Sequence, residues 1–139
     1  MGWRSTCGIL EVMADAKPKV LLVEDDPFMV TLLSQEFSRE GFEVSFADNG
    51  EDAPKRFQST NPDVLVIDIL LPKKNGLEAL AEIRTLPGGE KVPVVILSNL
   101  EESNYIADAE KLGVKAYLIK ANVQLSEIVA KVKEIIKKK

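Results

Sequence analysis

The sequence contains no histidine and a single cysteine, Cys7, among its 139 residues. Without histidine, the chain lacks the base of a Ser-His-Asp or Cys-His pair, a His-ligated metal site and a phosphohistidine of its own. A lone cysteine excludes an internal disulfide and a Cys-x-x-Cys metal or redox site. Chemistry in this chain therefore depends on carboxylates, lysines and hydroxyl groups, and the low cysteine content favours a cytoplasmic location.

An excess of positive charge and long apolar runs are also missing. The 18 lysines and arginines are outnumbered by 22 acidic residues, which gives a formal net charge of -4. An acidic chain is poorly suited to neutralising nucleic-acid phosphates or coating an anionic membrane, so we expect neither partner. No apolar stretch approaches the roughly 20 residues that cross a bilayer. With 45% hydrophobic residues, the chain is typical of one globular domain.

Residues 1–17 differ in composition from the rest of the chain. Their apolar stretch between Cys7 and Met13 is short and is interrupted by Glu11, which argues against a secretory signal. We expect a leader outside the fold, with Met13 as an alternative start; a docking arm that carries Trp3 is the competing interpretation. The folded domain is expected to span residues 18–139.

From Lys19 onward, short aliphatic runs alternate five times with stretches of helical period. The predicted strands are 19–23, 42–47, 64–68, 92–98 and 116–119, and the predicted helices are 27–39, 50–59, 77–86, 101–112 and 123–137. Strands as apolar as VLVID and VPVVILS are typical of a parallel sheet that is covered on both faces. The pattern predicts an α/β fold. Pro54, early in the second helix, predicts that this helix is short or weakly formed at its start.

Polar side chains follow the predicted strands where each one ends. Glu24 and Asp25 follow the first strand, Asp68 ends the third, and Ser98 and Lys120 stand at the ends of the fourth and fifth. In an open α/β sheet these positions meet at one edge, where ligands bind. Two carboxylates about 5 Å apart repel by roughly 3 kcal/mol at an effective dielectric of about 20, so a cluster of three favours a divalent cation and a lysine as counter-charges. An all-oxygen cluster suits Mg²⁺.

The runs VLLVEDDP and DVLVIDILLPKKNG, together with Ser98 and the YLIK that ends at Lys120, resemble the receiver domain of response regulators in two-component signalling. The resemblance covers residues 18–138 and needs no shift in the family's spacing. It implies a (βα)5 flavodoxin-like, doubly wound parallel sheet with strand order 2-1-3-4-5. It also implies a phosphorylation-dependent switch that receives a phosphoryl group from a sensor histidine kinase or a phosphotransfer protein and signals to a downstream protein by contact.

The resemblance assigns roles to individual residues. It makes Asp68 the phosphoacceptor, Ser98 the hydroxyl switch, Tyr117 the aromatic switch and Lys120 the lysine that contacts the phosphoryl group. It places Mg²⁺ on Asp25, Asp68 and the backbone carbonyl of Leu70, with Glu24 acting mainly through water. These residue types suit phosphoryl transfer to a carboxylate, which needs a nucleophile, a metal and a cation on the opposite side of the transferred group. The lifetime of the phosphoryl group is assigned to Leu70 and Leu100.

Two positions depart from the family pattern. The family commonly has proline after the lysine of the fifth strand, often with a cis bond, whereas this chain has Ala121, which leaves the conformation of that loop open. Ser98 replaces the more frequent threonine and keeps the hydroxyl group. Tyr117 also has a purely structural interpretation, as a strand aromatic that packs under a helix.

Other functions fit the sequence less well. A phosphatase of the haloacid-dehalogenase type also uses a strand-end aspartate with Mg²⁺, but it carries a second aspartate where this chain has Leu70. A receiver-shaped scaffold without phosphorylation is disfavoured because every functional position is filled in type, and a Rossmann protein because no G-x-G-x-x-G follows the first strand. We expect no enzyme activity beyond Mg²⁺-dependent self-phosphorylation and autodephosphorylation. The predicted domain is a monomer or a weak phosphorylation-dependent dimer without its own output domain, and it acts as an effector, relay or phosphate sink.

Overall fold

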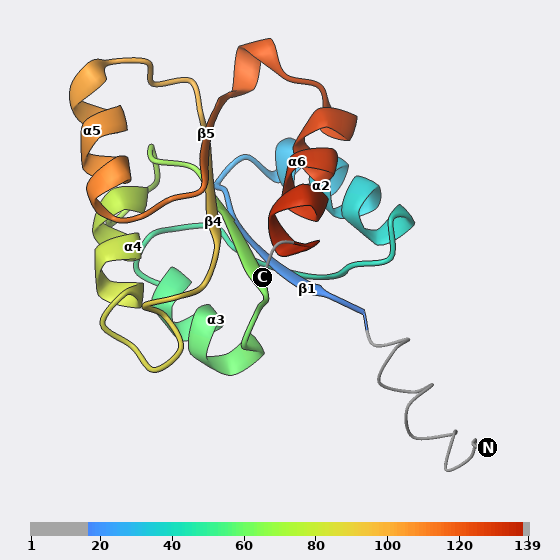
Figure 1. The fold of residues 1–139 in the computed structure, drawn as a ribbon, viewed down its shortest axis with the longest axis horizontal. Coiled ribbons are helices and arrows are strands. Elements are labelled where there is room, and N and C mark those ends of the chain that lie inside the picture. Colours follow the sequence, from blue (N-terminus) through green and yellow to red (C-terminus); the bar gives the residue numbers. More distant parts are fainter. Residues whose placement is uncertain (1–16, 138–139) are drawn as a thin grey trace.

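The structure is a computed structural model, and it describes residues 17–137 of the chain. In these residues, five strands alternate with five α-helices (Figure 1). In chain order the elements are β1 (Lys19–Val23), α2 (Pro27–Arg39), β2 (Glu43–Ala47), α3 (Ala53–Thr60), β3 (Val64–Ile67), α4 (Gly76–Ile83), β4 (Val94–Ser98), α5 (Ser103–Lys111), β5 (Ala116–Ile119), a 3-10 helix η1 (Lys120–Asn122) and α6 (Leu125–Lys137). Apart from Lys17, the expected leader lies outside the described residues. No helix among the described residues is long and apolar enough to cross a membrane.

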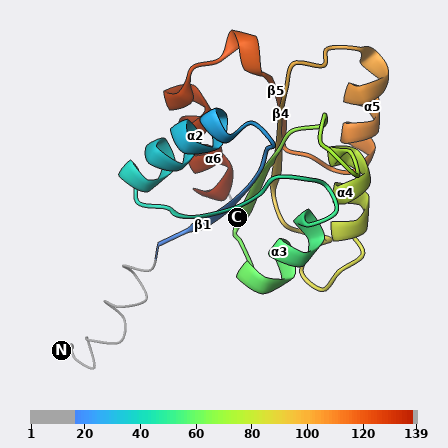
Figure 2. The same ribbon diagram turned by 180° about the vertical axis from the view of Figure 1, so that it is seen from behind.

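The strands form one parallel sheet in the order β2-β1-β3-β4-β5. Helices α2 and α6 cover one face of the sheet, and α3, α4 and α5 cover the other, as the two opposite views show (Figures 1 and 2). Because successive strand residues point to opposite faces, Val20 and Leu22 join one core and Leu21 and Val23 the other. The predicted doubly wound fold and its strand order are therefore confirmed.

Several element boundaries differ from the predictions by a few residues. Strand β4 begins at Val94 rather than at residue 92 because Pro93 has no N–H to donate to a neighbouring strand. Phe42 precedes β2 and packs edge-to-face on Phe37, with 5.0 Å between the ring centroids. Helix α3 begins at Ala53 rather than at residue 50, and Pro54 lies in its first turn, where a missing N–H is tolerated. The short second helix that Pro54 predicted is present.

The other helices also differ at their ends. Helix α4 spans residues 76–83 rather than 77–86, α5 spans 103–111 rather than 101–112, and α6 begins at Leu125 rather than at residue 123. Strand β3 ends at Ile67, so that Asp68 directly follows it. Helical periodicity continues into turns, which is why sequence patterns overrun the ends of helices.

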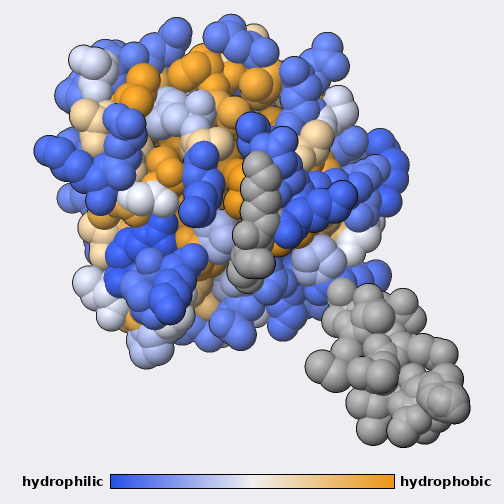
Figure 3. All heavy atoms as spheres, in the orientation of Figure 1, coloured by the Kyte–Doolittle hydropathy of each residue, from blue (hydrophilic) through white to orange (hydrophobic). Residues whose placement is uncertain are grey.

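Apolar side chains are not confined to the two cores. Phe28, Phe46 and Leu70 are the exposed large hydrophobic residues in the described part of the chain, and the last two lie at or beside the carboxyl ends of strands. On the face shown in Figure 3, hydrophilic side chains form most of the periphery, and hydrophobic ones lie between them. The carboxyl-terminal edge of the sheet thus combines exposed apolar side chains with the acidic residues described below.

Candidate functional site

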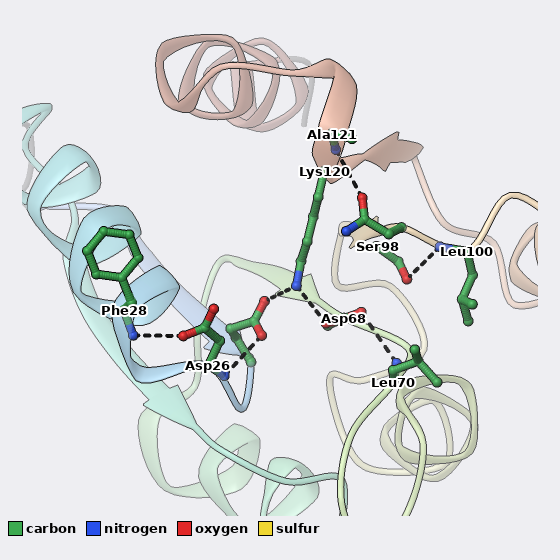
Figure 4. Close-up of polar contacts among 10 residues, drawn as sticks. Asp26, Phe28, Asp68, Leu70, Ser98, Leu100, Lys120 and Ala121 are labelled. Carbon is green, nitrogen blue, oxygen red and sulfur yellow. Dashed lines mark hydrogen bonds and ion pairs between the residues drawn. The ribbon is translucent and has the colours of Figure 1, made fainter.

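The carboxyl ends of β1, β3 and β5 bring three carboxylates and one ammonium group together (Figure 4). Ligand oxygens of Glu24, Asp25 and Asp68 all lie within 4.8 Å of one another. The Nζ atom of Lys120 lies 2.7 Å from Oδ2 of Asp68 and 2.6 Å from Oε1 of Glu24. Strands β1 and β3 are neighbours in the middle of the sheet, and the crossover to β2 on the far side of β1 opens this edge to a ligand.

Glu24 is almost completely buried, and both of its carboxylate oxygens have partners. One accepts from Lys120, and the other accepts from the backbone N–H of Asp26 at 3.1 Å. Burial raises the pKa of Glu24 above its usual value, although the hydrogen bond from Lys120 acts in the opposite direction. In this structure Glu24 orients Lys120; its predicted action on Mg²⁺ through water stays a prediction.

Lys120 remains a cation despite its partial burial. Burial by itself lowers the pKa of this side chain, but the hydrogen bonds to Asp68 and Glu24 outweigh that effect, so its pKa is raised. The ammonium is therefore charged at neutral pH and balances the carboxylates that surround it. Its partners, Glu24 and Asp68, directly follow strands β1 and β3, so the lysine connects three strand ends.

Asp68 is 7% exposed and lies in a fixed orientation. Its Oδ2 atom accepts from Lys120, and its Oδ1 atom accepts from the backbone N–H of Leu70 at 3.3 Å. The first residue of α4 is Gly76, and a Cβ atom there would lie 2.0 Å from the backbone carbonyl oxygen of Asp68. Glycine at this position lets the start of α4 pack directly against the backbone of the candidate phosphoacceptor.

Ser98 ends strand β4 near Asp68 and is completely buried. Its Oγ atom accepts from the backbone N–H of Leu100 at 3.3 Å, and the hydroxyl of Tyr117 donates to the carbonyl oxygen of Leu100 at 2.7 Å. Burial raises the pKa of Tyr117, whose ring packs against the core on the side of α3, α4 and α5. The structural interpretation of Tyr117 thus describes its present position, and its role as a switch stays a prediction.

Two further residues, Asp26 and Asn99, make contacts near the site. Asp26 accepts from the N–H of Phe28 at 3.0 Å as the N-cap of α2, and its own N–H orients Glu24. Asn99 accepts from the backbone N–H of Ala121 at 3.0 Å. The open question about the loop after Lys120 is answered by the 3-10 helix η1, and no cis peptide bond occurs among the described residues. The only sequence signal for the Asn99 contact was the N–H that alanine has and proline lacks.

The donor set fits a divalent cation. Carboxylate oxygens from two neighbouring strand ends lie close together, and Asp25 is exposed. Oxygen-only donors of this kind are the ligands that Mg²⁺ prefers. An acidic cluster suited to Mg²⁺ is therefore present, as the sequence predicted.

Replacing Asp25 with asparagine is expected to raise the melting temperature in chelator by about 2–4 °C, because one of three clustered negative charges is removed. The same change is expected to abolish stabilisation by Mg²⁺, because one of the predicted ligands is lost. Thermal melts with chelator and with Mg²⁺ measure both effects. Asp108→Asn, an exposed substitution on α5, is the control and should respond to Mg²⁺ like the wild type. A variant that melts below the wild type in chelator would contradict the predicted repulsion.

Known proteins resemble this chain in sequence and in fold. Residues 20–133 match the family described as the response regulator receiver domain. The chain is 35% identical over 103 residues to the chemotaxis protein CheY of Listeria monocytogenes, which covers 73% of this chain and 85% of that protein. It is 31% identical over 121 residues to the phosphate regulon transcriptional regulatory protein PhoB of Rhizobium meliloti, covering 87% of this chain and 53% of that protein, so it spans about half of PhoB.

Among solved structures, the chain resembles the receiver domain of the sensor histidine kinase PA1611 from Pseudomonas aeruginosa, which has a magnesium ion coordinated in its active-site cleft. The TM-score is 0.79 at 25% identity, with 88% of this chain and 99% of that domain covered. Because the family match extends from β1 into α6 and includes every strand end described above, the chain belongs to the response regulator receiver domains of two-component signalling.

Proposed function

We propose that this domain accepts one phosphoryl group on Asp68 in a Mg²⁺-dependent reaction and signals by a change in its protein contacts. The observation that carries the proposal is the contact of Lys120 with both Asp68 and Glu24 beside the exposed Asp25. Phosphoryl transfer needs a nucleophile between a metal and a cation, and this arrangement supplies all three positions. Membership of the receiver family sets aside the phosphatase alternative, and the filled site argues against the scaffold alternative.

The proposed step is a direct displacement at phosphorus. A carboxylate oxygen of Asp68 forms a bond to phosphorus while the bond to the donor's leaving group breaks, and the leaving group keeps the electron pair. Lys120 and the Ser98 hydroxyl then contact phosphoryl oxygens, with charge-assisted hydrogen bonding from the ammonium. Asp25, Asp68 and the carbonyl of Leu70 would hold Mg²⁺, which would supply further positive charge for these oxygens.

The phosphoryl donor is proposed to be a protein phosphohistidine on a sensor histidine kinase or a phosphotransfer protein. These 139 residues contain no histidine, so a phosphohistidine donor lies outside them. The proposed recipient of the signal is a downstream protein in the cytoplasm. This domain is proposed to contact it as a monomer or as a weak phosphorylation-dependent dimer, and to bind neither nucleic acid nor membrane. Effector, relay and phosphate-sink roles share the same first step.

The proposal is tested by incubating the protein with acetyl phosphate and Mg²⁺ and recording intact-mass spectra. One added phosphoryl group is expected with Mg²⁺, and none is expected in chelator. A mass that stays unchanged with Mg²⁺, at donor concentrations that phosphorylate a known receiver domain in parallel, would overturn the proposed function.

The phosphorylated state is expected to be long-lived because leucines stand at both lifetime positions. Leu70 is 60% exposed, and Leu100 packs against the core. Both side chains are hydrocarbons, so neither offers a hydrogen bond to an attacking water molecule. The double variant Leu70→Asn, Leu100→Glu is expected to release phosphate about tenfold faster than the wild type. Phosphate release after removal of the donor measures the rate, and Leu70→Met, Leu100→Met is the apolar control. A double polar variant that is no faster would contradict the expectation.

A further inference from the structure

We propose that Asn99 is a positioning residue for phosphoryl transfer, because its side chain holds the loop that carries Lys120. The Oδ1 atom of Asn99 accepts from the backbone N–H of Ala121 at 3.0 Å, and Ala121 directly follows the lysine (Figure 4). The inference rests on the proposed function and adds a residue that the family resemblance does not assign. It concerns how this chain aligns Lys120 with Ser98.

This hydrogen bond joins the segment after β4 to the segment after β5, and the reaction requires a fixed position of one relative to the other. Asn99 directly follows Ser98 at the end of β4, and Ala121 directly follows Lys120 at the end of β5. The bond therefore connects the neighbours of the hydroxyl and the ammonium that contact the same phosphoryl group. A second bond, from the hydroxyl of Tyr117 to the carbonyl of Leu100, ties the β4–α5 loop to β5 at another point. Together, the two hydrogen bonds fix the β4–α5 loop relative to β5 and to the residue that follows Lys120.

The loop after Lys120 has little else to hold its backbone. Helix η1 has three residues, and no side chain next to it in sequence caps its first turn. Ala121 and Asn122 are exposed, so apolar packing contributes little there. A proline at position 121 would restrict φ of that residue through its ring. Alanine lacks this restraint but has an N–H, and the side chain of Asn99 uses it to restrain the same position.

The contribution is expected to appear in the rate of phosphorylation rather than in stability. In the resting state Lys120 is held by Asp68 and Glu24, so its side chain stays in the site even if the loop relaxes. During transfer the Lys120 ammonium exchanges its contact with Asp68 for a contact with the phosphoryl group. Its alignment with that group then depends on the position of the loop backbone. Misplacement of a catalytic group by about 1 Å can slow a reaction up to about 10²-fold.

The test compares Asn99→Leu, which has a similar size and no acceptor, with Asn99→Asp, which keeps an acceptor oxygen. Phosphorylation by acetyl phosphate is followed at saturating Mg²⁺ and high ionic strength, where the added charge of aspartate is screened. We expect Asn99→Leu to be about five- to tenfold slower and Asn99→Asp to stay within about twofold of the wild type. The dissociation constant for Mg²⁺ and the melting temperature in chelator are expected to stay unchanged for Asn99→Leu.

Hydrogen exchange of the Ala121 amide reports the contact independently of activity, and it is expected to be faster in Asn99→Leu than in Asn99→Asp. Equal phosphorylation rates for Asn99→Leu and the wild type would overturn the inference while leaving the proposed function intact. Equal slowing by both substitutions would also overturn it, because the acceptor would then be irrelevant. A wild-type protein that takes up no phosphoryl group would reject the proposed function, and the inference with it.

Discussion

Asp68→Asn is expected to abolish phosphorylation and to leave the fold intact. Asparagine has nearly the same size and keeps an oxygen that can accept from Lys120, but its neutral amide is not a nucleophile toward phosphorus. The substitution also removes one negative charge beside Glu24, so the melting temperature in chelator should not fall. Intact-mass spectra after treatment with acetyl phosphate and Mg²⁺ measure the expected complete loss.

Asp108→Asn is the matched control for this experiment. Asp108 lies exposed on α5 and is not a member of the acidic cluster. The control variant should take up one phosphoryl group at the wild-type rate, and peptide mapping of the wild type should locate the group on the peptide that contains Asp68. Undiminished phosphorylation of Asp68→Asn would show that another residue accepts the phosphoryl group and would reject the proposed role of Asp68.

Arg84→Met is expected to lower the free energy of unfolding by about 3 kcal/mol. Arg84 follows the last residue of α4, at the edge of the sheet opposite the acidic cluster. Its guanidinium donates to four backbone carbonyls at 2.7–3.3 Å, those of Leu112, Gly89, Val92 and Gly113. It thereby joins the chain before β4 to the end of α5. Burial lowers the pKa of Arg84, but an arginine stays charged under all ordinary conditions.

The expected loss of unfolding free energy in Arg84→Met follows from the number of hydrogen bonds that the guanidinium makes and from their partial exposure to water. A hydrogen bond from a charged donor contributes about 1.5–3 kcal/mol when buried, and water replaces part of that contribution at this half-buried site. Methionine keeps the apolar stem, so the change isolates the guanidinium. Thermal melts should show a fall of about 10 °C. Arg39→Met, which removes an exposed ion pair with Glu36, should change the melting temperature by about 2 °C or less. Equal effects of the two substitutions would contradict the assigned role of Arg84.

The phosphorylation rate separates the two classes of prediction. Arg84 and the acidic cluster occupy opposite edges of the sheet. The Arg84→Met variant should therefore be phosphorylated at the wild-type rate at temperatures where it is folded. Asp68→Asn should behave in the opposite way, with normal melting and no phosphorylation. This contrast tests whether Asp68, at the carboxyl-terminal edge of the sheet, is needed for phosphorylation and Arg84, at the opposite edge, is needed for stability.

The fold class and the location of the site were predictable because both depend on local patterns. Apolar strands such as VLVI alternate with amphipathic helices, and a parallel sheet places all strand ends with the same sense on one edge. The acidic residues after β1 and β3 and the lysine after β5 had to meet there. Element ends were less predictable because helical periodicity continues through capping turns, as at α4 and α5.

Local patterns in the sequence were sufficient to predict the alternation of strands and helices, the residue types at each strand end and, because the 139 residues contain no histidine, the lack of a phosphohistidine among them. Which of those residues contact one another became known only from the folded chain. Lys120 contacts Glu24 as well as Asp68, Asn99 holds Ala121, and Arg84 binds four carbonyls from separate segments. These contacts join residues far apart in sequence, and their geometry depends on the paths of loops and on the packing of helices across the sheet, which no local pattern encodes.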